Sequence, residues 1–178
     1  ATESVRSVRN NFSDVIGRVQ QHHERVTITK NGEPAAVLIS PEDLDSMEET
    51  LTILSEPGAR AELAEAEQSI LDGDVVAGAD AIAASVKVTE GSYNVVLSRP
   101  AARALEERLP EAVAVAAIDF INGPLSDNPQ RVGGPLHGEL EGCRSARRGT
   151  YRIVYRIDET KHAVFVLRIA HRRDVYST

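Results

Sequence analysis

The sequence predicts an α+β protein of two small domains, because charge and secondary-structure pattern both change along the chain. The 178 residues carry a net charge of −7, yet acidic residues crowd the part before Val86 and basic residues the stretch 144–173. Such asymmetry indicates parts with different partners. A helix–hairpin–helix pattern fills the first part, and a strand, two helices and three strands fill the last. We therefore expect domains at residues 1–56 and 87–178, joined by an acidic segment at 57–86.

The N-terminal domain is predicted from three local patterns. Apolar residues recur every three or four positions across residues 4–21, as on one face of a helix. Asn31-Gly32 lies between two β-rich runs, which predicts a hairpin. Ser40-Pro41 predicts the start of a second helix, because Ser caps the first turn and Pro suits its first position.

The acidic segment is expected to gain its structure from a partner. Glu56-Pro57-Gly58 ends the second helix, and Ala59–Leu71 predicts another that has few large apolar residues. Such a helix has little to bury on its own account, and residues 75–86 add only small apolar side chains. We predict that residues 57–86 are poorly ordered alone and wrap a partner.

The C-terminal domain is predicted to place two helices on an antiparallel sheet. Tyr151–Ile157 alternates apolar and polar residues, the pattern of a half-buried antiparallel strand. The other expected elements are a strand at 93–97, a helix opened by Arg99-Pro100, a helix at 111–121, and strands at 142–148 and 163–170.

Arginines gather on one face of that sheet. Arg152 and Arg156 are four residues apart on a strand and so share a face, while Arg168 and Arg172 lie on the next strand or just beyond it. No acidic residue lies between Gly142 and Arg156 to pair with them. Guanidinium groups bind two oxygens of a phosphate in one plane, so this face is predicted to bind a polyanion.

The motifs Leu140-Glu141-Gly142, Ser145–Asp158 and His171–Tyr176 resemble the RelE/ParE superfamily of toxins. The resemblance runs from about Tyr93 to Tyr176. Its ending, an Arg and a near-terminal Tyr, is more similar to the ribosome-dependent messenger-RNA interferases than to the gyrase-poisoning ParE branch. The resemblance implies an endoribonuclease that cuts mRNA in the ribosomal A site, inhibits translation, and needs no metal or cofactor.

The resemblance also implies the roles of single residues. Arg152 would hold the scissile phosphate, Arg172 would stabilise developing charge or protonate the leaving oxygen, and Tyr176 would stack on a base. The RNA's own 2′-hydroxyl would attack the adjacent phosphorus, which requires positioning and cationic stabilisation.

The general base is left open, because the lysines that RelE enzymes often carry before the Tyr-Arg motif are replaced here. An Arg is a poor proton acceptor, whereas His171 has a suitable ordinary pKa and is our candidate acid or base; the alternative is a surface His without a role. The remaining basic residues of this region are interpreted as RNA contacts: Arg144, Arg147, Arg148 and Arg156.

The N-terminal part, about Ser4 to Leu54, resembles the Phd/YefM antitoxins in three stretches: Ser7–Ser13, Val26–Glu33 and Ala36–Asp43. The resemblance implies a dimerisation domain that forms a homodimer and represses its own operon by binding operator DNA. It also implies that the acidic segment covers and neutralises the toxin. The residues that match the DNA-binding positions are Arg6, Arg9, Asn11 and Lys30.

Several features argue against other classes of protein. A single cysteine, Cys143, forms no internal disulfide, and the adjacent His22-His23 have no companions for a metal site. No apolar run reaches the roughly 18 to 20 residues of a membrane span, and the N-terminal residues lack the order of a signal peptide. We therefore expect a cytoplasmic protein without metal.

The origin of the single chain and the activity of its toxin part both stay open. Antitoxin and toxin of these families are ordinarily separate chains, so this chain is a natural fusion or a joined pair, with the junction at Val86–Ser92. The toxin part is either an active RNase or a catalytically inactive part of an autorepressor. A ParE-like inhibitor of DNA gyrase is the third interpretation.

Overall fold

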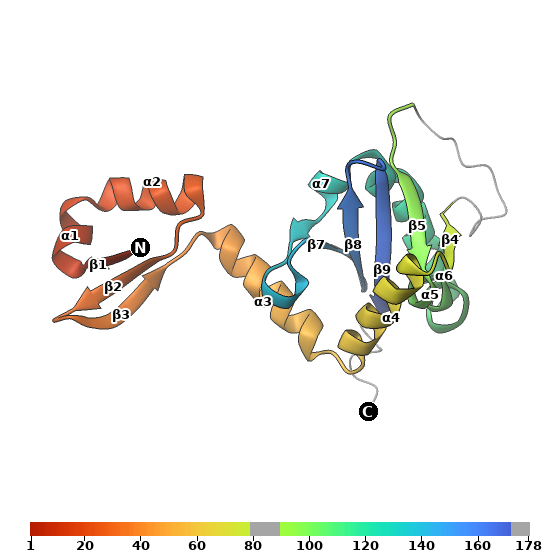
Figure 1. Ribbon diagram of the computed structural model, residues 1–178, viewed down its shortest axis with the longest axis horizontal. Helices are drawn as coiled ribbons and strands as arrows, with labels where there is room; N and C mark the ends of the chain where they lie inside the picture. The colour runs from red at the N-terminus through yellow and green to blue at the C-terminus, as the bar shows by residue number, and fades with distance from the viewer. Residues whose placement is uncertain (79–89, 172–178) are drawn as a thin grey trace. The chain divides into compact units, whose positions relative to one another are not determined.

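The computed structural model describes residues 1–78 and 90–171 of the chain (Figure 1). The chain divides into two compact units, Ala1–Glu48 and Glu49–Thr178. Both mix helices and strands, which confirms the predicted α+β class. The domain boundaries at residues 56 and 86 stay a prediction.

The first unit is a small sheet with helices. The strand order is β1-β2-β3, with β1 parallel to β2 and β2 antiparallel to β3. Asn31 and Gly32 both have positive φ, 54° and 85°, as a tight hairpin turn requires. The elements are β1 (Thr2–Ser4), α1 (Val5–Asn10), α2 (Phe12–His22), β2 (Val26–Lys30), β3 (Glu33–Leu38) and the start of α3 (Pro41–Ser55).

The predicted apolar stripe forms the core of this unit. Val8, Val15 and Val19 pack on Val26 of β2. The single helix expected over residues 4–21 was wrong, because Asn11 leaves the helical conformation at φ −125° and divides the stretch into α1 and α2. The stripe continues across the break, so the apolar spacing predicted the buried face but not the interruption.

The second unit is built on one six-stranded sheet of order β4-β5-β9-β8-β7-β6. The expected antiparallel sheet was wrong in one place, because β5 and β9 run parallel. The elements after α3 are α4 (Ala59–Leu71), β4 (Val75–Ala77), β5 (Asn94–Ser98), α5 (Arg99–Arg103), the π-helical turns η1 (Ala104–Arg108) and η2 (Ile121–Leu125), α6 (Glu111–Phe120), α7 (Pro129–Val132), β6 (Gly134–Pro135), the 3-10 turn η3 (Gly138–Leu140), β7 (Cys143–Arg148), β8 (Tyr151–Asp158) and β9 (Ala163–His171).

Helices cover both faces of this sheet. Helices α5 and α6 pack on one face, which we call the α6 face, around a core that includes Ile153, Tyr155 and Phe120. The end of α3 and helix α4 pack on the other, the α4 face, where Ile53 and Leu63 are buried. Figure 1 shows α4 beside β9. Residues of the predicted acidic segment therefore form one layer of this unit.

The acidic segment also adds a strand to the sheet. Strand β4 pairs antiparallel with β5, with Val75 opposite Ser98 and Ala77 opposite Val96. Addition of a strand satisfies backbone groups that an edge strand would otherwise expose. The segment is thus held by side-chain packing through α4 and by backbone hydrogen bonds through β4.

Candidate nucleic-acid interface

Strand β8 carries two of the predicted cationic residues on the α4 face. Ile153 and Tyr155 are buried on the α6 face, which confirms the predicted alternation. Arg152 and Arg156 therefore point the other way, with Val154 between them in the core of the α4 face. The basic face predicted from the sequence is the one that α3 and α4 cover.

A β-bulge brings a third arginine to this face. The register between β8 and β9 shifts at Val154/Tyr155, where Arg168 and Val166 are the partners and Leu167 is the extra residue. Leu167 packs in the core of the α4 face, and its neighbour Arg168 bonds to carboxylates on the same side. In a regular strand, adjacent side chains would point to opposite faces.

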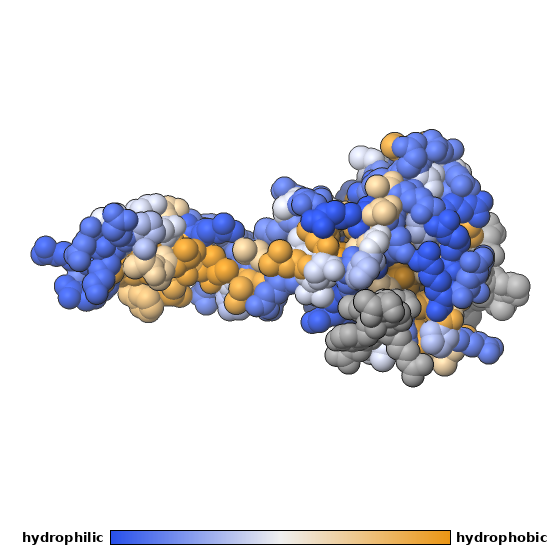
Figure 2. Space-filling model, turned by 90° about the horizontal axis from the view of Figure 1, so that it is seen from below, coloured by the Kyte–Doolittle hydropathy of each residue, from blue (hydrophilic) through white to orange (hydrophobic). Residues whose placement is uncertain are grey.

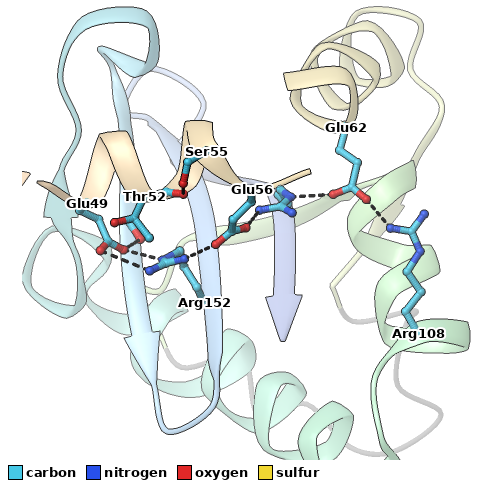
Figure 3. Close-up of polar contacts among 9 residues, drawn as sticks. Glu49, Thr52, Ser55, Glu56, Glu62, Arg108 and Arg152 are labelled. Atoms are coloured by element: carbon cyan, nitrogen blue, oxygen red, sulfur yellow. Dashed lines mark hydrogen bonds and ion pairs between the residues drawn. The ribbon is translucent and has the colours of Figure 1, made fainter. Parts of the chain in front are cut away.

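Glutamates and arginines alternate across the α4 face, and we call these six residues the arginine–glutamate ladder (Figure 3): Glu49, Arg152, Glu56, Arg168, Glu62 and Arg108. Glu49 lies in α3, Glu56 directly after it and Glu62 in α4, whereas the arginines come from β8, β9 and η1. Acidic and basic members thus belong to different parts of the sequence.

Two of the glutamates each bridge two arginines. Glu56 accepts from Arg152 Nη1 at 2.5 Å through one oxygen and from Arg168 through the other. Glu62 accepts from Arg168 Nε at 2.6 Å and from Arg108 through its second oxygen. Glu49 completes the ladder by accepting from Arg152 Nε at 2.6 Å. These charge-assisted contacts are among the stronger hydrogen bonds in proteins.

Burial is greatest in the middle of the ladder. The side chain of Glu56 is 2% exposed and that of Arg168 is 7% exposed. Burial acts to lower the pKa of Arg168, but its hydrogen bonds to Glu56 and Glu62 raise the pKa overall. Burial acts to raise the pKa of Glu62, and its hydrogen bonds to Arg168 and Arg108 lower it overall. The pairing therefore favours the ionised forms of both partners.

Two of the predicted RNA contacts, Arg147 and Arg156, flank the ladder on the α4 face. Arg156 Nη2 donates to Glu67 at 3.0 Å and its guanidinium lies 5.0 Å from the Phe165 ring centre. Arg147 is 70% exposed, with Nε 3.7 Å from Glu49. These two arginines therefore extend the basic surface of the α4 face on both sides of Arg152.

The other two predicted RNA contacts, Arg144 and Arg148, lie on the opposite side of β7. Arg144 Nη2 donates to the carbonyl oxygens of Gln130 and Gly133 at 2.7 and 2.8 Å. The guanidinium of Arg148 lies 4.6 Å from the ring centre of Phe120. Their contacts hold the segment around α7 to the sheet, away from the ladder.

His171, the candidate acid or base, is buried at the end of β9. Its Nε2 lies 3.0 Å from Thr150 Oγ1, and the residue pairs with Tyr151 in the sheet register. Tyr151 belongs to the core of the α6 face, and paired residues of neighbouring strands share a face, so the His171 side chain lies on the α6 face. The structure therefore does not bring this candidate to the side of the sheet on which Arg152 lies. The other two candidates, Arg172 and Tyr176, lie outside the described residues.

Most ion pairs on the α4 face involve residues that the sequence patterns did not identify as site residues. The paired residues not singled out as site residues are Glu49, Glu56, Glu62, Arg168 and Arg108, together with the pairs Arg103–Glu65 and Arg99–Asp74, both 2.6 Å apart. A signal existed, because the acids recur along residues 49–74 while the helix Ala59–Leu71 has few large apolar side chains. An acidic stripe of this kind indicates a basic partner.

The four predicted DNA contacts are exposed in the first unit. Arg6 and Arg9 lie one turn apart on α1, and Lys30 ends β2. The Asn11 side chain donates to the Ser7 carbonyl at 3.3 Å. By contrast, Arg18 is paired with Glu3 and with Glu24 at 3.1 Å, so it adds less to the local positive charge.

The described residues give no support to a metal site. No group of three His, Cys, Asp or Glu side chains within residues 1–78 and 90–171 is arranged to hold a metal ion. His23 Nδ1 instead lies 3.3 Å from Asp43, and burial raises the pKa of the Cys143 thiol. In the same part of the chain, no helix is both long and apolar enough to cross a membrane.

The fold and the ladder define a class: a protein in which an acidic segment occupies the basic face of a sheet domain. Residues 1–73 match the family described as Antitoxin Phd_YefM, type II toxin-antitoxin system. Residues 95–176 match the ParE toxin of type II toxin-antitoxin system, parDE.

Individual relatives agree with both matches. Toxin RelE of Mycobacterium tuberculosis (strain ATCC 25618 / H37Rv) is 50% identical over 84 residues, which cover 47% of this chain and 86% of that protein. Antitoxin RelB of the same organism is 48% identical over 69 residues, which cover 39% of this chain and 78% of that protein. The chain therefore belongs to the RelBE-type toxin–antitoxin modules and joins a Phd/YefM antitoxin part to a ParE/RelE-type toxin part.

A solved structure is also similar in sequence. It is the crystal structure of the toxin–antitoxin complex RelBE2 from Mycobacterium tuberculosis, with 47% sequence identity and a TM-score of 0.44. The match covers 46% of this chain and 99% of that chain. In the present chain, the antitoxin and toxin parts contact each other through the packing on the α4 face and through the pairing of β4 with β5.

Proposed function

We propose that the toxin part is a ribosome-dependent mRNA endoribonuclease, an mRNA interferase that inhibits translation, and that the antitoxin part keeps it inactive. The observation that carries this proposal is the position of Glu56, a nearly fully buried carboxylate shared by Arg152 and Arg168. A carboxylate held by two arginines occupies a place where a phosphate would bind. The family supports an RNase type of toxin.

The proposed reaction requires little covalent chemistry from the protein. The 2′-hydroxyl oxygen forms a bond to the adjacent phosphorus while the bond from phosphorus to the 5′ oxygen breaks. The products are a 2′,3′-cyclic phosphate and a 5′-hydroxyl, and one proton moves from the 2′ oxygen to the leaving oxygen. Arg152 holds the phosphate, Arg172 stabilises the developing charge, and Tyr176 stacks on a base.

Inhibition follows from the contacts of Arg152. Its Nε and Nη1 atoms already donate to Glu49 and Glu56 at 2.6 and 2.5 Å. A phosphate and these carboxylates compete for the same donors, so RNA binds only after the α3–α4 segment leaves. Release exposes both partners of each ion pair to water, and the recovered hydration offsets much of the lost attraction.

Gyrase inhibition is the second candidate function. The family that matches residues 95–176 is described as a ParE toxin, which leaves this interpretation open. In that case the basic face would bind a protein or DNA target and no RNA would be cut. A catalytically inactive autorepressor would show neither activity.

For the antitoxin part we propose operator binding and autorepression through Arg6, Arg9, Asn11 and Lys30. The support is their shared exposure in the first unit. Local charge decides contact with phosphate, whatever the net charge of the chain. Replacing Arg9 with Ala is expected to abolish the operator shift in a gel assay while antitoxin–toxin contact persists; an unchanged shift contradicts the assignment.

We also propose that this part forms the homodimer. Its support is apolar surface that the unit leaves exposed: Val5, Phe12 and Val37 are 46%, 55% and 53% exposed. Figure 2 shows apolar atoms gathered on one side of this unit. A second copy of the chain would bury such surface, as in the family that it resembles.

The enzymatic proposal is tested by freeing the toxin part from the chain. A protease site is inserted within residues 79–89, the chain is cut, and the antitoxin fragment is removed before addition to a translation extract. Primer extension is expected to show mRNA cuts at codon positions, absent from the uncut chain and from Arg152→Gln. The matched control Arg131→Gln, an exposed arginine of α7, should still cut. Intact RNA together with blocked DNA supercoiling would instead support gyrase inhibition.

A further inference from the structure

The ladder extends beyond the residues that the proposed reaction uses. Arg152 and Arg168 share the proposed phosphate position that Glu56 occupies, but Arg108 has no role in the proposed reaction. Arg168 is fixed beside Arg152 by the bulge in β9, and Arg108 by η1 at the end of the first toxin helix. Their backbone positions are set by elements of the toxin part.

The glutamates of the ladder mark two anion positions in a row. Glu56 lies between Arg152 and Arg168, and Glu62 lies between Arg168 and Arg108. Each uses its two oxygens on two different guanidinium groups. A phosphodiester also offers two non-bridging oxygens, and a nucleic acid strand presents such groups one after another. Arg168 is common to both positions and so would contact two neighbouring phosphates.

Exposure differs along this row in a way that suits an entering strand. The Arg152 and Arg168 side chains are 12% and 7% exposed, whereas Arg108 is 46% exposed. These values hold with the α3–α4 segment in place, so the position between Arg152 and Arg168 is the one that this segment encloses, and the one beside Arg108 is open to solvent. Arginines that are not fully hydrated bind phosphate more strongly than exposed ones.

We propose that Arg168 and Arg108 continue the phosphate site of Arg152 into a track for two adjacent backbone phosphates of single-stranded RNA. The scissile phosphate lies between Arg152 and Arg168, where Glu56 lies in the inhibited chain. The neighbouring phosphate lies between Arg168 and Arg108, at the position of Glu62. This inference rests on the proposed RNase function and adds a second phosphate position, between Arg168 and Arg108, to it.

The test compares oligonucleotides with one and two phosphates on the same complex. The chain with a protease site within residues 79–89 is cut, and a fluorophore on the antitoxin fragment reports its release. Uncleavable 2′-O-methyl dinucleotides and trinucleotides are titrated, the third residue of the trinucleotide being abasic so that base stacking adds nothing. The two-phosphate probe is expected to release the fragment at about tenfold lower concentration, since hydrogen bonds between charged groups are stronger than those between neutral ones.

The ratio of the two half-release concentrations separates RNA binding from antitoxin affinity. Weaker antitoxin binding shifts both probes equally, so the ratio does not change. Arg108→Gln should bring the ratio close to one. The matched control is Arg99→Gln, which removes the 2.6 Å pair with Asp74 outside the ladder and should leave the ratio at about tenfold.

Several results would overturn the track. These are a ratio near one in the unsubstituted chain, an equal fall in Arg99→Gln, or no release by either probe at millimolar concentration. The inference and the RNase proposal fail separately. If no mRNA is cut but the ratio is about tenfold, the RNase proposal is wrong and the track is kept. If mRNA is cut but the ratio is one, the track is wrong and the RNase proposal is kept.

Discussion

The two faces of the six-stranded sheet are packed by different chemistry. The α6 face is an apolar core in which Ile153, Tyr155 and Val166 are fully buried against helices of the toxin part. The α4 face combines a smaller apolar cluster with the ladder, in which Glu56 and Arg168 are nearly fully buried. One face is closed by residues close in sequence, and the other by the antitoxin part.

This difference shows which interface is able to open. Apolar core packing gains stability wherever apolar area is buried, and separating it exposes that area to water. Buried ion pairs add less net stability, because the desolvation of both ions offsets their attraction. An interface that includes six charged side chains can therefore be specific and still exchange its acids for another anion.

The largest expected effect lies on the α6 face. Tyr155→Ala removes a fully buried ring and should lower the free energy of unfolding by about 3–5 kcal/mol, as measured by urea denaturation. Tyr155→Phe, the matched control, removes only the hydroxyl that donates to the Pro129 carbonyl at 2.5 Å and should cost much less. If both variants were equally destabilised, the ring would not be the source of the stability.

The next effect breaks the centre of the ladder. Glu56→Gln leaves Arg152 and Arg168 without a shared negative charge, although the amide oxygen still accepts a hydrogen bond. Antitoxin affinity in the cut complex should fall by roughly 2–3 kcal/mol, or about 30- to 150-fold, measured by fragment dissociation. Glu65→Gln, which removes the half-exposed pair with Arg103, is the control and should change affinity far less. An equal loss in both variants would show that burial of the charge does not matter.

Much of the fold was predictable because its local signals are strong. Asn31-Gly32, Ser40-Pro41 and the helix Ala59–Leu71 all lie where the sequence places them. The break at Asn11 was not predictable from spacing, because the apolar stripe runs through it. Nor was the parallel pairing of β5 with β9, which depends on contacts between distant parts of the chain.

The site was predictable only in part. The alternation along β8 placed Arg152 and Arg156 on one face, as the structure confirms. The position of Arg168 on this face depends on the β-bulge, which no residue pattern predicts. Its partners Glu56 and Glu62 lie more than a hundred positions away in the sequence. The expectation that residues 57–86 cover the toxin agrees with the pairs that Glu62 and Glu67 make, whereas Glu49 and Glu56 lie before that segment.

Acid is expected to weaken the α4 face selectively. The hydrogen bonds from Arg168 and Arg108 overcome the effect of burial and lower the pKa of Glu62 below its usual value of 4.5. A group with a lowered folded pKa stabilises fully above its unfolded pKa and loses that contribution as the pH falls through the folded value. Fragment release from the cut complex should therefore rise below about pH 4.5, with a smaller pH dependence in Glu62→Gln. A pH profile unchanged by that substitution would remove Glu62 from the explanation.

The smallest effect is expected at the rim of the α4 face. Arg60 pairs with Glu139 at 3.1 Å, but the two side chains are 61% and 63% exposed, so water screens the pair. Arg60→Gln should leave fragment affinity almost unchanged at physiological salt, and any loss visible at low salt should vanish as salt is added. A loss as large as that of Glu56→Gln would mean that distance alone, without burial, decides which ion pairs hold the antitoxin. The contrast between these two variants therefore tests whether the buried centre of the ladder carries the inhibition.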